Sequence, residues 1–416
     1  MDMINLIIQK LLKYLVFILR CIVTPIFRLQ YFKKRKRIPA IKNQLLLISA
    51  TEIARQIRKK MISSEEVVRA YVERCTDVNP VINAIVESRF SAAIQEAQEV
   101  DKLLASTTKT EEELACEMPL LGVPITVKES FAVEGLVPLE GHKPYSHDES
   151  FTLLCTPGTM VRYADDLSLM MKIMCQSEET RKKFDEKVCL KDMKFFYLED
   201  CCAISDSIGK DVKQAMKKLK IHIETTYGLK VEKARLPAMK FVFYVTSLML
   251  SVNLDDINDD IKCAGSSRCL LEELKLICGM SQNTFSAVTY TLIKWVYHKL
   301  PESYQRKMSA KQDELKKQFE ELLGDNGVLI FPTFVSSAYY SYESYMNIFN
   351  FMYLTVANVI AIPATHCTMG INKRGLPFGL QIMANAGNDH LTIAVAKEID
   401  ETFGGWQPPP MTELQV

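Results

Sequence analysis

The chain has 416 residues, of which 48% are hydrophobic, and it carries 51 Lys and Arg against 50 Asp and Glu. This size and composition can bury the core of a globular protein and exclude a disordered chain. The net charge of +1 gives the molecule as a whole no attraction for nucleic acid, so any basic binding surface must be local.

The first 37 residues predict a membrane-binding segment. Their apolar stretch is interrupted by Gln9, Lys10, Lys13 and Arg20. It therefore lacks the ~20 uninterrupted apolar residues of a spanning helix. The spacing of the three charges places them on one side of a helix, which favours a helix lying in the membrane interface. The basic residues that follow would bind an anionic leaflet: Lys33, Lys34, Arg35, Lys36 and Arg37.

Two other interpretations of this segment stay open. It could be an amphipathic helix packed in a core and followed by solvated charges, or it could contain a nuclear localisation signal. An apolar helix beside a basic cluster supplies the two signals that stable membrane anchoring needs, which favours attachment. If the helix spans, the positive-inside rule places the rest of the chain in the cytosol. We therefore expect an intracellular membrane protein whose main domain faces the cytosol.

From residue 38 onward, helical and strand-like patterns alternate, which is typical of an α/β protein. Apolar spacing predicts helices over 65–75, 90–106, 160–175 and 209–228, a long helical region over 237–323, and a last helix over 389–404. Ser63 and Glu66 form a capping box before the first of these helices. Strands are predicted over 80–88, 120–128, 193–200, 229–236, 327–332 and 376–384. No linker divides residues 38–416, so we expect one domain there.

Standard catalytic and metal-binding patterns are missing from the sequence. It contains no G-x-S-x-G, G-x-x-x-x-G-K-[ST], G-x-G-x-x-G or H-E-x-x-H. Its six histidines are scattered, and its 12 cysteines include no C-x-x-C pair. We therefore expect no metal site, no disulfide framework and no cofactor, and we interpret the cysteines as reduced, buried thiols of a cytosol-facing protein.

Two long blocks of sequence resemble a known family. One is LISATEIARQIRKKMISSEEVVRAYVERC and the residues after it, as far as LLGVPITVKESFAVEGL. The other is NVIAIPATHCTMGINKRGLPFGLQIMANAGNDHLTIAVAKEIDETFGGW, which includes a G-L-P-x-G-x-Q element. Together with GHKP and RYADDL, these blocks resemble the amidase signature family and, within it, the membrane-anchored fatty-acid amide hydrolases of the second type.

This resemblance implies a fold and a chemistry. The implied fold is an α/β/α sandwich on a mixed sheet, and the implied reaction is the hydrolysis of fatty-acid amides. In the family a lysine accepts a proton relayed through a bridging cis-Ser from a nucleophilic Ser, and a glycine-rich loop stabilises the oxyanion. The match GVPITVKES places the family lysine at Lys128, at the end of a predicted apolar strand.

The chain departs from the family directly after Lys128. Between FAVEGL and GHKP only VPLE is present, so the Ser/Gly-rich block with both serines and the oxyanion loop is absent at about 136–141. The low glycine count, 16 in 416 residues, agrees with this loss. No other serine is expected to replace the nucleophile. This holds for Ser63 and Ser64, Ser130, Ser266 and Ser267, and Ser336 and Ser337.

Three hypotheses follow. The chain is a fatty-acid amide hydrolase-like protein with impaired or no activity, whose sheet is incomplete because the block is absent. Alternatively, it is a non-catalytic membrane protein that binds a lipid, forms a homo-oligomer or pairs with a full-length homologue. In the third hypothesis the sequence is a truncated splice form or an incorrect gene model of an active amidase. None of the three involves nucleic acid.

Overall fold

In this computed structural model, residues 2–32, 38–128, 158–252, 299–340 and 343–409 are described, together with Leu271, Lys275, Met280 and Trp295. The chain folds into two compact units. Unit 1 comprises Met1–Tyr31, His147–Gly158 and Lys187–Ile399, and unit 2 comprises Phe32–Ser146, Thr159–Glu186 and Asp400–Val416. The domain boundaries predicted from the sequence, 1–37 and 38–416, stay predictions.

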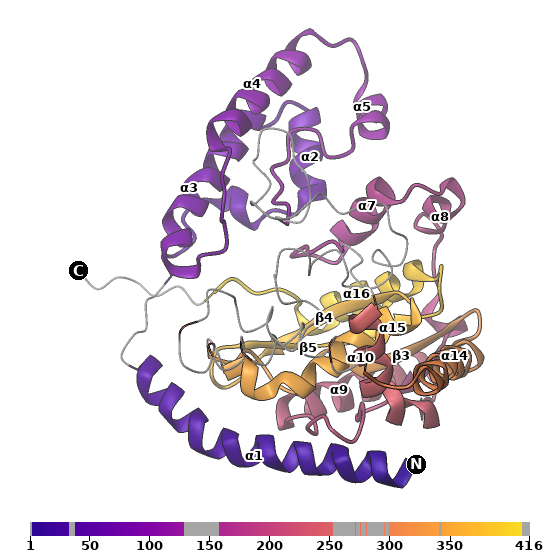
Figure 1. Ribbon diagram of the computed structural model, residues 1–416. Helices are drawn as coiled ribbons and strands as arrows, with labels where there is room; N and C mark the ends of the chain where they lie inside the picture. The colour runs from indigo at the N-terminus through magenta and orange to yellow at the C-terminus, as the bar shows by residue number, and fades with distance from the viewer. Residues whose placement is uncertain are drawn as a thin grey trace. The chain divides into compact units, whose positions relative to one another are not determined.

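Unit 1 contains a five-stranded mixed sheet with the strand order β2-β1-β3-β5-β4 (Figure 1). Its strands are β1 (Lys194–Tyr197), β2 (Val231–Lys233), β3 (Gly327–Pro332), β4 (Ala364–Ile371) and β5 (Pro377–Ala384). The first three run parallel to one another, and β5 runs antiparallel to both β3 and β4. The predicted α/β class and mixed sheet are therefore confirmed.

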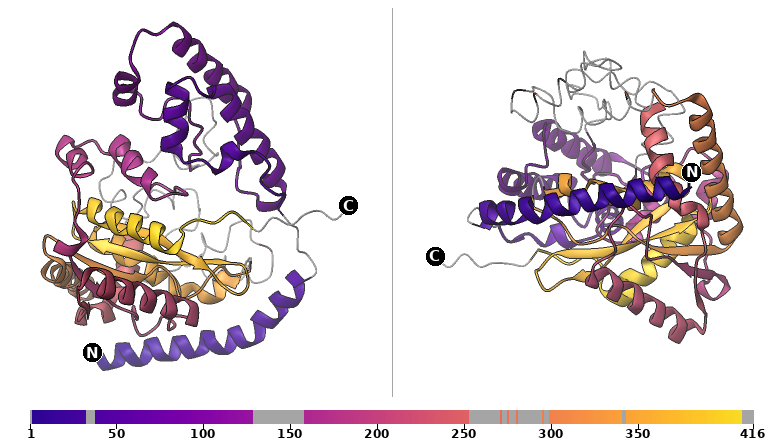
Figure 2. Two further views of the ribbon diagram at one scale, coloured as in Figure 1. Left: turned by 180° about the vertical axis from the view of Figure 1, so that it is seen from behind. Right: turned by 60° about the horizontal axis from the view of Figure 1, so that its bottom comes forward.

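Helices cover both sides of this sheet. Figure 2 shows α9 (Lys210–Tyr227) and α16 (Asp389–Phe403) on one side, with α10 (Val242–Val252) and α14 (Glu302–Leu323) on the other. The central strand β3 is buried along its whole length, as expected for a strand with a sheet neighbour on each side and helices above and below. The described residues of unit 1 also form α1 (Asp2–Phe32), α15 (Met352–Ile360), η2 (Leu190–Asp192), η3 (Pro237–Phe241) and η4 (Glu343–Phe351).

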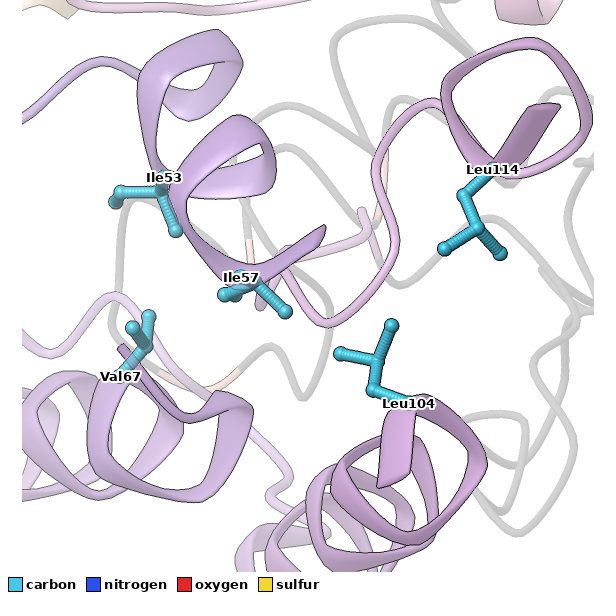
Figure 3. Packing of buried hydrophobic residues seen from close by; sticks show 5 residues of the cluster. All are labelled: Ile53, Ile57, Val67, Leu104 and Leu114. Carbon is cyan, nitrogen blue, oxygen red and sulfur yellow. The ribbon is translucent and has the colours of Figure 1, made fainter. Parts of the chain in front are cut away.

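Unit 2 is helical over its described residues. It consists of η1 (Gln44–Leu47), α2 (Ala50–Arg58), α3 (Ser64–Ile82), α4 (Phe90–Ser106), α5 (Glu111–Glu117), α7 (Asp165–Met174) and α8 (Glu178–Lys183). Ile53 and Ile57 of α2 meet Val67, Leu104 and Leu114 of the next three helices in one buried cluster (Figure 3). The apolar faces of four helices thus build the core of unit 2.

The predicted strand over 80–88 is wrong. Residues 80–82 are instead the last turn of α3, and Asn83 ends the helix in the left-handed conformation, with φ of 48°. The side chain of Asn79 holds this exit, because its Oδ1 accepts hydrogen bonds from the backbone N–H groups of Ala84 and Ile85 at 2.9 and 2.8 Å. These local bonds satisfy donors that a strand would have paired with a neighbour.

Two further predictions need correction. Cys201 and Cys367 are buried as expected, but Cys21, Cys116 and Cys189 are exposed. The helix predicted over 160–175 begins only at Asp165. By contrast, α4, α9, α16, β3 and β5 lie within a residue of their predicted positions.

The N-terminal segment forms α1, a single helix of 31 residues. Within the described part of the chain, no helix is both long and apolar enough to cross a membrane. The basic residues predicted to bind the membrane, Lys33, Lys34, Arg35, Lys36 and Arg37, lie outside the described residues.

Candidate active site around Lys128

The segment that leads to Lys128 starts from a turn held against α3. Gly122 adopts φ of +76° in this turn, and its carbonyl accepts a hydrogen bond from Ser64 Oγ at 3.1 Å. Leu121 and Val123 on either side of it pack against the buried cluster of unit 2. The approach to Lys128 is therefore fixed by packing as far as Val123.

The first backbone N–H groups of α3 donate to the side chains of Ser63 and Asp101. Ser63 Oγ accepts from the Glu66 N–H at 3.1 Å, as the capping pattern predicts. The Asp101 carboxylate accepts from the Ser64 and Glu65 N–H groups at 2.7 and 3.0 Å. Ser63 and Ser64 thus have structural roles, in agreement with their rejection as nucleophiles.

Beyond Val123 the chain leaves the core. The structure assigns no strand to residues 123–128, and the prediction of an apolar strand ending at Lys128 is wrong for these residues. Ile125 and Val127 are 65% and 46% exposed, and Lys128 is exposed as well. A strand needs a neighbouring strand to take up its backbone hydrogen bonds, and none of the strands in the described residues pairs with residues 123–128. The role of Lys128 as the family base stays a prediction.

The described serines near the sheet also serve the fold. Ser337 Oγ is buried and accepts hydrogen bonds from Asn372 Nδ2 and the Arg374 guanidinium, both at 3.0 Å. Ser336 Oγ donates to the Ser337 carbonyl at 2.9 Å. In neither contact does the hydroxyl meet a basic group that could remove its proton. Ser130, Ser266 and Ser267 lie outside the described residues.

Two pairs of a hydroxyl and a histidine were not foreseen from the sequence. Thr333 Oγ1 lies 2.7 Å from His366 Nδ1. Thr226 Oγ1 lies 3.2 Å from His222 Nδ1, and His222 Nε2 lies 2.6 Å from Glu398 on α16. The spacing i, i+4 could have revealed the second pair. Thr226 is exposed on a helix surface, where water would compete for any oxyanion, so we interpret this chain of contacts as a link between α9 and α16.

The family-like segments RYADDL and FGGW hold unit 2 together. Asp166 is 3% exposed, and its carboxylate accepts from the Ala50 N–H and from both the N–H and the hydroxyl of Thr51, at 2.7 to 2.9 Å. The Arg162 guanidinium lies 4.9 Å from the centre of the Trp406 ring. The family-like residues of these segments therefore stabilise the fold and are not reacting groups.

Relatives among known proteins align with most of the chain. It is 29% identical to human "Fatty-acid amide hydrolase 2" over 484 residues, which cover 88% of this chain and 91% of that protein. It is 28% identical to "Fatty-acid amide hydrolase 2-A" of Danio rerio over 498 residues, which cover 91% of this chain and 93% of that protein. Because 88% of 416 residues is about 366, about 118 positions of the human alignment have no counterpart in this chain.

Solved structures support the fold, and a family model supports the membership. A "Fatty acid amide hydrolase" structure matches with a TM-score of 0.63 and 15% identity, covering 88% of this chain and 87% of that one. A bacterial aryl acylamidase of the amidase signature family matches with a TM-score of 0.59 and 12% identity, covering 85% and 96%. The family model described as Amidase matches residues 66–145 and 134–393. Because these matches span most of the sequence, the chain belongs to the amidase family.

Proposed function

We propose that this chain is a fatty-acid amide hydrolase-like protein that has lost the serine-bearing block and does not hydrolyse amides as it stands. One observation carries the proposal. The family model matches in two stretches that meet at 134–145, and the sequence pattern places the missing block at about 136–141. The alignment to the human relative contains about 118 positions without a counterpart in this chain, which leaves room for a block of that kind.

The chemistry explains why such a loss would abolish activity. Amide hydrolysis by this family's mechanism needs a nucleophile, a relay and oxyanion donors within hydrogen-bond reach of one another. Lys128 would supply only the last acceptor of the proton. The hydroxyls of Ser63, Ser64 and Ser336 are engaged in a helix cap and in backbone contacts, and that of Ser337 accepts from two side chains, which supports the absence of a substitute.

The surroundings of Lys128 also support the proposal. Ile125 and Val127 alternate along the chain with the polar or small residues Thr126 and Pro124, a pattern typical of a strand with one buried face. Both apolar side chains are instead exposed. A block that supplied neighbouring strands would cover them, so the exposed pair is what we expect to remain after its loss.

The test is to restore the block. The purified chain is incubated with a long-chain fatty-acid amide and with a fluorophosphonate probe for activated serines, and we expect hydrolysis and labelling equal to those of a heat-denatured control. A chimera carrying the human relative's block between Leu136 and Gly141 should gain both. Lys128→Ala in that chimera should remove at least 99% of the hydrolysis, whereas Lys102→Ala, at an exposed position of α4, should leave it unchanged.

Hydrolysis or labelling by the unmodified chain would contradict the proposal. A native transcript that encodes a Ser/Gly-rich block between the codons for Leu136 and His142 would also contradict it. In that case the natural product is an active amidase, and the present sequence is a truncated form of it.

A second function is favoured by the two family-like blocks at either end of the chain, which are retained although the chemistry is missing. We propose that the protein is attached to an intracellular membrane by its N-terminal helix and binds a lipid, or a full-length relative, without turning it over. Retention of a labelled fatty-acid amide by the vesicle-bound chain would support lipid binding. If neither the amide nor a co-expressed full-length relative is retained, this second function is wrong.

A further inference from the structure

One side of α1 is polar and faces unit 1. Gln9 is buried, with 2% of its surface exposed, and Lys13 Nζ donates to the Ser205 carbonyl. The Arg20 guanidinium forms an ion pair with Asp206 at 2.6 Å and donates to the Met346 carbonyl at 3.1 and 3.3 Å. Gln9, Lys13 and Arg20 follow one another at spacings of four and seven residues, which are one and two helical turns. They therefore share one face of the helix. Unit 1 therefore holds α1 by its polar face.

Hydrogen bonds with Asn350 hold the Asp206 carboxylate in position for its contact with Arg20. It accepts from Asn350 Nδ2 at 3.0 Å, and the Asp206 N–H donates to Asn350 Oδ1 at 2.8 Å. Burial alone would raise the pKa of Asp206, but the hydrogen bonds from Asn350 and Arg20 and the charge of Arg20 hold that pKa below its ordinary value. The carboxylate is therefore charged where Arg20 meets it.

The opposite side of α1 is apolar and exposed. Its large side chains expose between 45% and 75% of their surface: Ile7, Leu11, Tyr14, Leu15, Phe17, Ile18, Leu19, Ile26 and Leu29. We call these nine residues the outer stripe. A surface helix of a water-soluble protein normally buries its apolar face and exposes its polar one. The arrangement in α1 is the reverse, so the outer stripe needs an apolar partner.

The positive charge of the N-terminal residues indicates which apolar partner covers the outer stripe. Between Met3 and Thr51 the sequence has ten Lys and Arg and no Asp or Glu, although the whole chain has a net charge of only +1. An apolar stripe within a strongly basic segment fits an anionic lipid surface, where each basic residue near the headgroups adds to the attraction. A second copy of the chain would bring the same positive charge and be repelled.

We propose that α1 lies in the plane of an anionic membrane, with the outer stripe in the lipid and the polar face held by Ser205, Asp206 and Met346. The helix is then a fixed part of unit 1, and it determines which face of unit 1 lies against the membrane. This inference rests on the membrane attachment proposed above. It differs from a spanning anchor, which would carry Lys13 and Arg20 away from their partners.

The first experiment measures binding of the full chain to vesicles by co-sedimentation, using phosphatidylcholine alone or with one quarter phosphatidylserine. We expect at least tenfold stronger binding to the anionic vesicles. The triple variant Leu11→Asp, Leu15→Asp, Ile18→Asp should lose at least tenfold. The control Met61→Asp, Val86→Asp changes residues that are equally exposed, at 63% and 70%, but lie in unit 2, and it should bind as the native chain does. No binding to either vesicle, or self-association through the outer stripe, would contradict both the attachment and its geometry.

The second experiment separates a helix in the plane from a spanning one. An epitope tag at the N-terminus of the membrane-bound protein should be cleaved by protease added outside sealed microsomes. If the tag is protected until detergent is added, attachment holds but the in-plane geometry is wrong.

The third experiment tests the docking with a pair of variants matched in charge. Arg20→Ala and Lys10→Ala each remove one positive charge from α1, but Lys10 is exposed. Only Arg20→Ala should increase the rate of amide hydrogen exchange over residues 9–24 in the vesicle-bound protein, by at least fivefold. Equal exchange in the two variants would contradict docking through Arg20.

Discussion

At the scale of single residues, Glu52 shows how a helix start acquires a pH dependence. Its carboxylate accepts hydrogen bonds from Arg55 at 2.6 and 2.7 Å and from Gln56 at 2.7 Å. These bonds, with Arg55 contributing most, lower the pKa of Glu52 from 4.5 to about 2. Because the folded pKa lies below the unfolded one, the contribution to stability is complete above pH ~4.5 and is lost as the pH falls toward 2.

We therefore predict that Glu52→Gln makes the free energy of unfolding depend less on pH between pH 6 and pH 2. At pH 6 it should lower the free energy of unfolding by less than about 1 kcal/mol, because the pair with Arg55 is partly exposed to solvent. At pH 2 the variant and the native chain should be equally stable. Urea unfolding at several pH values measures this difference. A constant difference from pH 6 to pH 2 would contradict the assigned pKa.

The residues of the candidate site were predictable only where the reason is local. The cap at Ser63 follows from four residues of sequence, and the structure confirms its bond to the Glu66 N–H. The hydrogen bonds that Asp166 accepts from the Ala50 and Thr51 N–H groups join positions more than 110 residues apart, so no local pattern could reveal them. Lys128 was found by resemblance alone, and its exposure depends on which segments surround it.

At the scale of secondary-structure elements, the turn after α5 depends on glycine at one position. Gly122 has φ of +76°, and a Cβ atom there would lie 2.7 Å from Ser64 Oγ and 2.9 Å from Ser64 Cβ. We predict that Gly122→Ala destabilises the protein by about 1–3 kcal/mol, because it combines an unfavourable backbone conformation with a clash.

Thermal unfolding measures this effect, with Gly158→Ala as the control. A Cβ atom at Gly158 would meet nothing within 4 Å, and its φ is not in the left-handed region. The control should therefore change stability by less than about 0.5 kcal/mol. If the two variants lose equal stability, the clash with Ser64 does not determine the conformation of the turn.

Elements whose sequence and tertiary setting agree were predicted well, and the others were not. The run GVLIFP is fully buried as β3, and the apolar spacing over 90–106 gives α4 with the predicted bounds. The runs over 80–88 and 123–128 have equally strand-like compositions. One is diverted by the Asn79 side chain, and the other has no neighbouring strand in the described chain. The periodicity of a sequence predicts which face of an element is apolar, but it does not predict whether another segment lies beside that face.

At the scale of the whole molecule, the N-terminal segment is the part of the chain that we expect to hold the protein on the membrane. We predict that deletion of residues 1–37 moves the protein from the membrane to the soluble fraction after cell lysis and centrifugation, because it removes both the outer stripe and the basic run. Replacing only Lys33, Lys34, Arg35, Lys36 and Arg37 by glutamine should weaken attachment without abolishing it. Unchanged membrane retention of the deleted protein would rule out the anchor.

The docking of α1 also orders the events of biosynthesis. The helix leaves the ribosome well before its partner Met346, which is 326 residues further along the chain than Arg20. Protein synthesis adds ~5–20 residues per second. Roughly 16 to 65 s therefore pass between the synthesis of Arg20 and that of Met346, and the apolar side of α1 is complete throughout this time. We expect the nascent chain to meet lipid during this interval. Unit 1 would then assemble on a helix that is already immersed, so that the bilayer acts as a template on which the protein folds.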